Sequence, residues 1–357
     1  DWSSDVCSSD LVRQGCFGHG ILLLKMETYG SGFVQCDLPQ RLTRKAKEVA
    51  MRPLRGIALK LGSVLVFIVM SSLIKSTAQH VPPGQAVFFR SFFAIPVIVA
   101  WLAMRRELAT GFRAKNPFGH VWRGLMGTLA MGMGFAGLAY LPLPEVTAIG
   151  YAAPLLVVIF AAMFLGEEVR LFRITAVALG LTGVLIVLSP RLTTLSGDAA
   201  SQREALGAVL VLFGAVCAAL AQVFVRKLVM TERTPAIVFY FSLTATLLSL
   251  VTIPFGWVMP TLTEGITLTA AGLLGGVGQI LLTSSYREAD ASLVAPFDYA
   301  SMLFALLIGY FVFAEVPSLT MLAGAALVIF AGILIIWRER QLGLERAKGR
   351  KAMTPQG

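Results

Sequence analysis

Asp298 is a carboxylate inside an otherwise apolar run, in the stretch SLVAPFDYASMLFALLIGYFVF. An ionisable residue at the centre of a bilayer costs roughly 2.5–3.5 kcal/mol on insertion scales, so such residues usually serve a function. In a polar cavity, Asp298 would bind a cationic group or exchange a proton. The alternative is an acid that hydrogen-bonds to a neighbouring helix or reaches the cytoplasmic interface. Pro296 removes one backbone donor and should loosen the helix beside it.

Three further polar side chains lie within or at the ends of apolar runs. Arg90, in VFFRSFF, could bind a substrate carboxylate through two parallel hydrogen bonds, or could extend to the outer interface. We expect Lys75, in SSLIKS, to extend to that interface. Ser72, close to it in sequence, would either face a cavity or bond back to its own helix.

Two tyrosines and one glutamine complete the set of candidate ligands. Tyr151 and Tyr299 each offer a ring face and one hydroxyl, and the alternative for both is helix packing. Gln279 adds a polar group to the run GLLGGVGQILL. We therefore predict a substrate site formed by Asp298, Tyr299, Tyr151, Arg90, Gln279 and Ser72.

The composition of the chain is that of a membrane protein. Of its 357 residues, 56% are hydrophobic and 14% are charged, and the mean hydropathy is +0.76. A soluble domain carries about 25% charged residues. Because backbone groups cannot be left unpaired in lipid, apolar runs of this length are expected to be helices.

The predicted fold class is an all-α membrane protein with ten transmembrane helices. An even number of crossings places both ends of the chain on one side. The expected spans lie near residues 57–77, 85–104, 122–140, 145–165, 171–189, 206–225, 236–255, 266–285, 292–313 and 319–337.

The net charge of +10 is best interpreted as membrane topology rather than as nucleic-acid binding. One set of connections and the tail hold 19 Lys and Arg residues, whereas the opposite connections hold two, Arg191 and Arg203. This count takes Arg123 as a residue at the cytoplasmic end of the third span. The asymmetry predicts cytoplasmic termini in the plasma membrane, here the bacterial inner membrane.

An internal repeat is predicted from matches at one constant offset. GLMG at 124–127 matches GLLG at 272–275, Tyr151 matches Tyr299, and Glu167 matches Glu315, each 148 residues apart. Because five spans is an odd number, the second half must enter the membrane in the opposite sense, as in many secondary transporters. The predicted segments are a non-native or disordered leader at 1–50, five-helix repeats at 57–189 and 206–337, and a basic cytoplasmic tail at 338–357.

These features resemble the EamA-type transporters of the drug/metabolite transporter superfamily. The resemblance rests on FLGEEVRLFRITAVALGLTGVLIVL and YFVFAEVPSLTMLAGAALVIFAGILII, in which a Glu closes the fourth helix of each half, and on APFDYASMLFALLIGYFVFAE. In that last pattern the family often has Glu where this chain has Asp298. The resemblance implies a ten-helix fold and transport of a small metabolite, because the family's substrates include amino acids, nucleotides, sugars and drugs.

The predicted function is therefore secondary transport of a small molecule by alternating access, with proton coupling left open. The chain has no G-x-x-x-x-G-K-[ST] motif for ATP and no H-E-x-x-H motif, and its cysteines form no C-x-x-C pair. We predict no enzymatic activity and no cofactor. The expected partners are a small-molecule substrate, the lipid bilayer and no nucleic acid, and a homodimer is left open. A membrane-embedded enzyme and a non-transporting scaffold are the alternatives.

The charge asymmetry predicts the location of reporters fused to the chain. A reporter after Gly357 should lie in the cytoplasm, and one inserted near Gly197 should lie outside, because positively charged connections stay inside. Phosphatase and fluorescent-protein fusions at both positions measure this. Two reporters on the same side would show that the span count is wrong.

Overall fold

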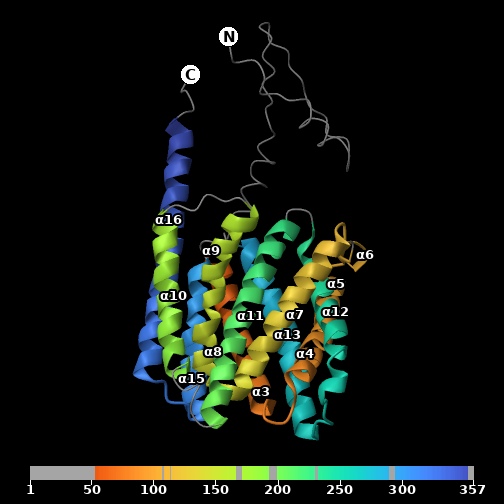
Figure 1. Cartoon of the computed structure of the whole chain (residues 1–357). Coiled ribbons are helices and arrows are strands. Elements are labelled where there is room, and N and C mark those ends of the chain that lie inside the picture. The colour runs from red at the N-terminus through yellow and green to blue at the C-terminus, as the bar shows by residue number, and fades with distance from the viewer. Residues whose placement is uncertain are drawn as a thin grey trace. The chain divides into compact units, whose positions relative to one another are not determined.

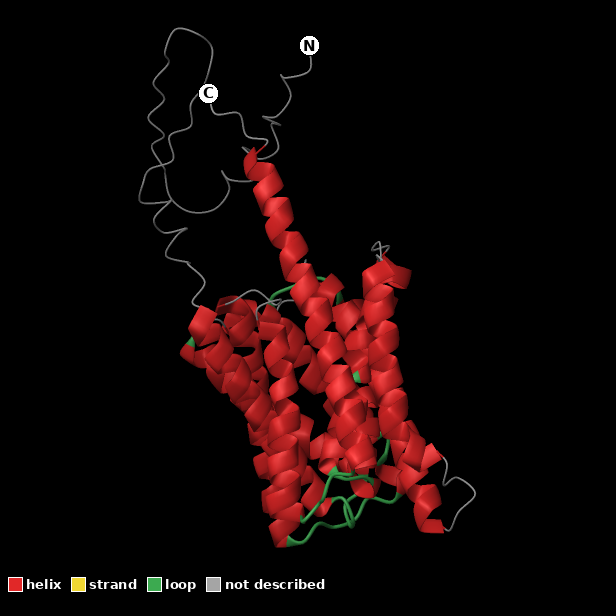
Figure 2. Ribbon diagram, turned by 90° about the vertical axis from the view of Figure 1, so that its left-hand side faces the viewer, coloured by secondary structure: helices red, strands yellow, loops and turns green. Residues whose placement is uncertain are grey.

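The computed structural model describes residues 53–106, 108–112, 114–165, 171–192, 199–229, 232–288 and 294–352. These residues belong to one compact unit, 51–357. Within them the secondary structure is helical, with loops between the helices and no strand (Figures 1 and 2). The predicted leader at 1–50 lies outside the described residues, as do Glu167 and its neighbours 166–170.

The helices form ten membrane crossings, which confirms the predicted fold class. Eight are long and apolar enough to span a membrane, and Pro235–Leu250 is a shorter apolar helix. The tenth, α7, contains His120 and Arg123 within its length. The crossings are α3 (Pro53–Thr77), α4 with α5 (Pro83–Phe92, Ala94–Met104), α7 (Pro117–Tyr140), α8 with α9 (Leu143–Gly150, Ala152–Leu165), α10 (Leu171–Leu192), α11 (Ala199–Val229), α12 (Thr234–Leu250), α13 (Leu262–Glu288), η2 with α15 (Ala295–Tyr299, Ala300–Phe313) and α16 (Leu319–Ala352); α6 (Leu108–Gly111) and η1 (Ile253–Phe255) are short turns.

Three crossings are interrupted where the sequence predicts continuous helices. The interruptions fall at Phe93, at Tyr151 and at the change from a 3-10 helix to an α-helix after Tyr299. Proline explains the first two. Pro96 and Pro154 become the third residues of α5 and α9, where a missing backbone donor breaks no helical hydrogen bond.

The contacts between helices are consistent with two halves that are related by a two-fold rotation. The pair α3 and α13, the first and eighth crossings, corresponds to the pair α7 and α11, the third and sixth. The pairs α4 with α12, α8 with α15, and α10 with α16 each join equivalent crossings of the two halves. This pattern is expected of an inverted repeat, because a two-fold operation either swaps such pairs or leaves them in place.

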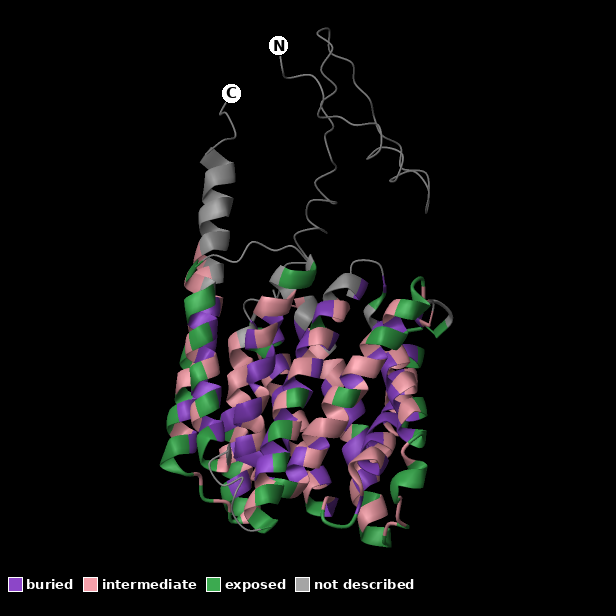
Figure 3. Cartoon of the chain, viewed as in Figure 1, coloured by how far each residue is buried: buried purple, intermediate pink, exposed green. Residues whose placement is uncertain are grey.

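Burial follows the expected pattern of a bundle in lipid. Buried residues gather on the inward faces of the helices, and exposed ones lie on outer faces and at helix ends (Figure 3). Large apolar side chains such as Leu185, Phe213 and Leu303 are more than half exposed on the bundle surface. An apolar outer surface of this kind is stable against acyl chains and would be unfavourable in water.

The backbones of α10 and α16 approach each other closely at two glycines. A Cβ atom at Gly324 would lie 2.7 Å from the carbonyl oxygen of Gly183, and one at Gly183 would lie 2.8 Å from that of Gly324. Without a hydrophobic drive between helices in lipid, association depends on this kind of close contact. The fifth and tenth crossings are therefore joined by backbone packing.

This contact predicts that Gly324→Ala destabilises the protein. The new methyl group would meet backbone rather than a flexible side chain, and overpacking costs about 1–3 kcal/mol. Gly134→Ala on α7 is the matched control, because its Cβ would meet nothing within 4 Å. Thermal unfolding in detergent should show a lower Tm for Gly324→Ala alone. Equal Tm values for the two variants would contradict the packing account.

Candidate functional site

Tyr151 and Tyr299 meet at the interruptions of the fourth and ninth crossings. Their ring centroids are 5.1 Å apart in an edge-to-face arrangement. The Tyr151 hydroxyl donates to the carbonyl oxygen of Tyr299 at 3.3 Å and lies 2.6 Å from Ser301 Oγ. A Cβ atom on Gly332 of α16 would overlap the Tyr299 hydroxyl, so this glycine makes room for the ring. The two tyrosines thus join equivalent points of the two halves.

Asp298 lies beside this tyrosine pair in the 3-10 helix η2 and forms an ion pair with Lys60. Lys60 Nζ on α3 is 2.7 Å from Asp298 Oδ1. The Lys60 side chain is 2% exposed, whereas that of Asp298 is 46% exposed. The pair joins the first half to the second, with Lys60 about 10 Å along α3 at 1.5 Å per residue.

The partner of Asp298 was missed by our sequence analysis. Lys60 stands in the apolar run GIALKLGSVLVF, and an intramembrane Lys is the natural counter-ion for an intramembrane Asp. The expectation of an acid bonded to a neighbouring helix therefore describes one side of Asp298. The rest of the Asp298 side chain is half-exposed.

Arg90 is buried between helices, so the alternative that it extends to the outer interface is wrong. Arg90 is 3% exposed, and its guanidinium carbon lies 5.6 Å from the centre of the Phe241 ring. Arg123 of α7 approaches the same ring at 3.7 Å. Arg123 therefore points into the bundle, although the sequence suggested a residue of the cytoplasmic surface.

Gln279 and Ser72 are half-buried, and neither belongs to the contacts described above for Tyr151 and Tyr299. The Ser72 hydroxyl donates to the Val69 carbonyl oxygen at 2.7 Å, so it bonds back to its own helix. Gln279 lies one helical turn beyond Gly275, whose Cβ position is 3.2 Å from Arg90 Nε. Gln279 is thus on the α13 surface nearest to Arg90.

Lys75 does not extend to the outer interface, contrary to our expectation. Its Nζ is 2.8 Å from Glu315 Oε1 and donates to the Leu141 carbonyl oxygen at 2.6 Å. Glu315 also accepts a hydrogen bond from the Leu143 backbone N–H at 2.9 Å, at the start of α8. Both side chains are largely buried, at 13% and 15% exposure. This cluster connects the two halves at the end of α3.

A second ionic cluster lies at the same end of the bundle. Arg191 donates from Nε and Nη2 to the two carboxylate oxygens of Glu145, at 3.0 and 2.8 Å, and also contacts Glu204. Glu145 occupies the first turn of α8, where a carboxylate also complements the helix dipole. Both clusters lie at the end of the bundle where α3 and α10 end and α8 begins.

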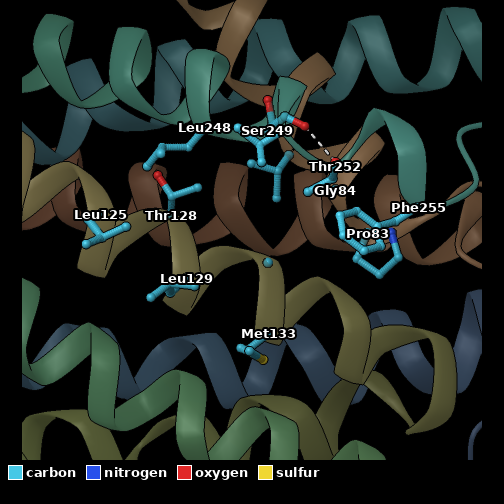
Figure 4. Close-up of a pocket in the computed structure, with 13 residues that line it drawn as sticks. Pro83, Gly84, Leu125, Thr128, Leu129, Met133, Leu248, Ser249, Thr252 and Phe255 are labelled. Carbon is cyan, nitrogen blue, oxygen red and sulfur yellow. Dashed lines mark hydrogen bonds between the residues drawn. The ribbon is translucent and has the colours of Figure 1, made fainter.

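An apolar cavity of about 380 Å³ opens between α4, α7 and α12 (Figure 4). Leu125, Leu129 and Met133 line it from α7, and Leu248 faces them from α12. The polar groups in its wall include Thr252, whose hydroxyl donates to the Ser249 carbonyl oxygen at 2.6 Å. The cavity can hold an apolar group but offers few groups for polar recognition.

Comparison with known proteins relates this arrangement to membrane transporters. The chain is 32% identical over 284 residues to the pseudopaline exporter CntI of Pseudomonas aeruginosa, covering 78% of this chain and 95% of the relative. It is 26% identical to the S-adenosylmethionine uptake transporter of Rickettsia bellii, covering 80% and 97%. It is 28% identical to the riboflavin transporter of Rhizobium johnstonii, covering 82% and 95%.

A solved crystal structure and a family model agree with these relatives. The crystal structure has a TM-score of 0.57 and 21% identity, covers 80% of this chain and 98% of its own, and supports the fold alone. The model of the EamA-like transporter family matches twice, at residues 54–189 and 205–338. The predicted resemblance is thereby confirmed, and the chain belongs to the EamA-like transporter family.

Proposed function

We propose that this transporter moves a small charged metabolite across the bacterial inner membrane by alternating access between the halves 57–189 and 206–337. The observation that carries the proposal is the meeting of the interrupted fourth and ninth crossings at Tyr151 and Tyr299, with the Lys60–Asp298 pair beside them. Interrupted helices at the interface of two repeats are typical substrate sites of secondary transporters. Membership of a transporter family removes the enzyme and the scaffold as alternatives.

The relatives support a polar, multifunctional metabolite as the substrate. Their names include an exporter of pseudopaline and transporters of S-adenosylmethionine and riboflavin. Export and uptake both occur among them, because alternating access runs in whichever direction the gradients favour. In the proposal, Asp298, Tyr299 and Tyr151 contact the substrate in the centre, and Arg90, Gln279 and Ser72 line the path beside them.

The ionic clusters support a state that is closed on the outside. Lys75 and Glu315 bind each other and the backbone between α7 and α8, so outward opening has to break these bonds. At the opposite end Asp298 is half-exposed. In the proposal this end faces the cytoplasm, and both termini lie there, in keeping with the charge asymmetry.

Asp298 and Lys60 are proposed to couple substrate movement to a proton or to a cationic group of the substrate. Because Asp298 is half-exposed, a cationic group of the substrate can replace Lys60 as its partner. Protonation of Asp298 would have the same effect, because it removes the attraction that holds the pair. The pair therefore works as a switch between the two halves.

The ion pair predicts different behaviour for single and double variants. Asp298→Asn alone removes the carboxylate charge 2.7 Å from the buried Lys60 Nζ, which should cost about 1–3 kcal/mol, less than for a fully buried pair because Asp298 is half-exposed. Lys60→Gln with Asp298→Asn should recover stability. In vesicles, the double variant should lose the pH dependence of uptake. The measurement is flux of S-adenosylmethionine, riboflavin and a mixture of amino acids under an imposed pH gradient.

The folding control for this experiment is Tm in detergent for each variant. Wild-type pH dependence in a well-folded double variant would contradict the coupling role. Flux of no compound by the wild-type protein, with intact folding, would contradict transport of this substrate class.

Weakening the outer cluster should favour the outward-open state. Glu315→Gln removes the charge that holds Lys75 and leaves the side-chain size nearly unchanged. We expect several-fold faster labelling of Leu138→Cys by a membrane-impermeant maleimide applied from outside, because Leu138 is 4% exposed beneath the cluster. The background replaces all four cysteines, Cys7, Cys16, Cys36 and Cys217, by Ser. Glu264→Gln, which removes the partner of the exposed His80, is the matched control. Unchanged labelling rates in Glu315→Gln would show that the cluster does not limit opening.

A further inference from the structure

Arg90 is a buried cation and Arg123 a partly buried one, and neither has a counter-ion in the part of the chain that the structure describes. The Nε and Nη1 atoms of both side chains are buried and make no hydrogen bond there. Neither side chain forms an ion pair with a described carboxylate, in contrast to Lys60, Lys75 and Arg191. A buried charge without compensation is strongly unfavourable, so its retention needs an explanation.

The two guanidinium groups lie against the same aromatic ring. Their central carbons are 5.6 Å and 3.7 Å from the centroid of Phe241, so they cannot be farther apart than these two distances together. Cation–π contacts with the ring offset part of the cost of burial. The two like charges still repel each other, and Phe241 cannot neutralise either of them.

Glycines provide the room that these arginines need. A Cβ atom at Gly127 would lie 2.5 Å from Arg123 Nη1 and 2.8 Å from Phe241, and one at Gly275 would lie 3.2 Å from Arg90 Nε. Both glycines belong to the matched stretches GLMG and GLLG of the two halves. The arginines are thus held by α4, α7, α12 and α13 together, where both halves contribute.

Other buried polar groups near these helices also lack partners. The hydroxyls of Ser91 on α4 and Ser242 on α12 are buried without a hydrogen bond to any described residue. They follow Arg90 and Phe241 directly in sequence. The two helices that carry Arg90 and Phe241 therefore each hold a further buried hydroxyl without a described partner.

We infer that Arg90 and Arg123, across Phe241, bind an oxyanion group of the transported substrate, and specifically a carboxylate. The planar guanidinium matches a carboxylate through two parallel hydrogen bonds, and the anion supplies the missing counter-charge. The apolar cavity lies along the same helices α4, α7 and α12 and can receive an apolar part of such a substrate. This inference rests on the proposed function and adds the substrate class, an organic anion, together with Arg123 as a second ligand beside Arg90, with Phe241 positioning both guanidinium groups.

The test measures anion binding without requiring transport. The purified full chain is titrated in detergent with sodium salts of acetate, succinate, citrate and inorganic phosphate, at constant ionic strength against chloride. The readout is the Tm, because a ligand that binds only the folded state raises it. The variants are Arg90→Gln and Arg123→Gln. The matched control is Arg105→Gln, since Arg105 also lies over an aromatic ring, Trp101 at 4.8 Å, but is exposed.

The expected result is a rise in Tm of the wild type and of Arg105→Gln with at least one carboxylate. Each of the other two variants should need at least about ten-fold more anion for the same shift, because it lacks a charged hydrogen-bond donor. Without added anion, Arg90→Gln and Arg123→Gln should be as stable as the wild type or more stable, since a repelling buried charge is removed. A structural role would instead lower their Tm.

Three outcomes would overturn the inference. These are no response of the wild type to any of the four salts, equal responses of all the proteins, or a response to phosphate alone, which would replace the carboxylate by a phosphate group. A wild type that binds carboxylates but moves none across vesicles would contradict the proposed function and leave this site in place. Flux of cationic compounds with no anion response would contradict only this site.

Discussion

Charges inside a bilayer need counter-charges from the protein itself, and this requirement organises the whole structure. Lys60 with Asp298 and Lys75 with Glu315 each join a residue of the first half to one of the second. Arg191 binds Glu145 and Glu204 at the end of α10. Because Lys60–Asp298 and Lys75–Glu315 join the two halves, the proposed motion of one half against the other would have to break these pairs. Ion pairs thus connect the two halves at Lys60–Asp298 and at Lys75–Glu315.

The exception to this pairing is informative for the same reason. Arg90 and Arg123 share an aromatic ring instead of a carboxylate. An anion bound there would supply the counter-charge that these two guanidinium groups lack among the described residues. Paired charges such as Lys60 and Lys75 thus join the two halves, whereas Arg90 and Arg123 are the residues that we infer to bind a ligand.

Close packing and interruption supply the mechanical side of the fold. Glycines bring α10 and α16 into backbone contact, and they leave space for Arg90, Arg123 and Tyr299 at the centre. Interrupted crossings place Tyr151 and Tyr299 where helical hydrogen bonding is already incomplete. Small residues allow helices to slide, and interruptions allow them to bend, so the same sequence features serve stability and motion.

Hydropathy alone determined the ten crossings of this protein, because a run of about 20 apolar residues has few alternatives to a membrane helix. The constant offset of 148 residues likewise identified Tyr151 and Tyr299 as equivalent. Only the tertiary structure decided which charges meet. Lys75 was expected at the interface but binds Glu315, Arg123 was counted as a surface charge but faces Phe241, and Lys60 was overlooked. The physical reason is that hydropathy indicates which segments lie in the membrane but not which helix faces meet. Ionic partners depend on those contacts, and the contacts are made by residues far apart in sequence.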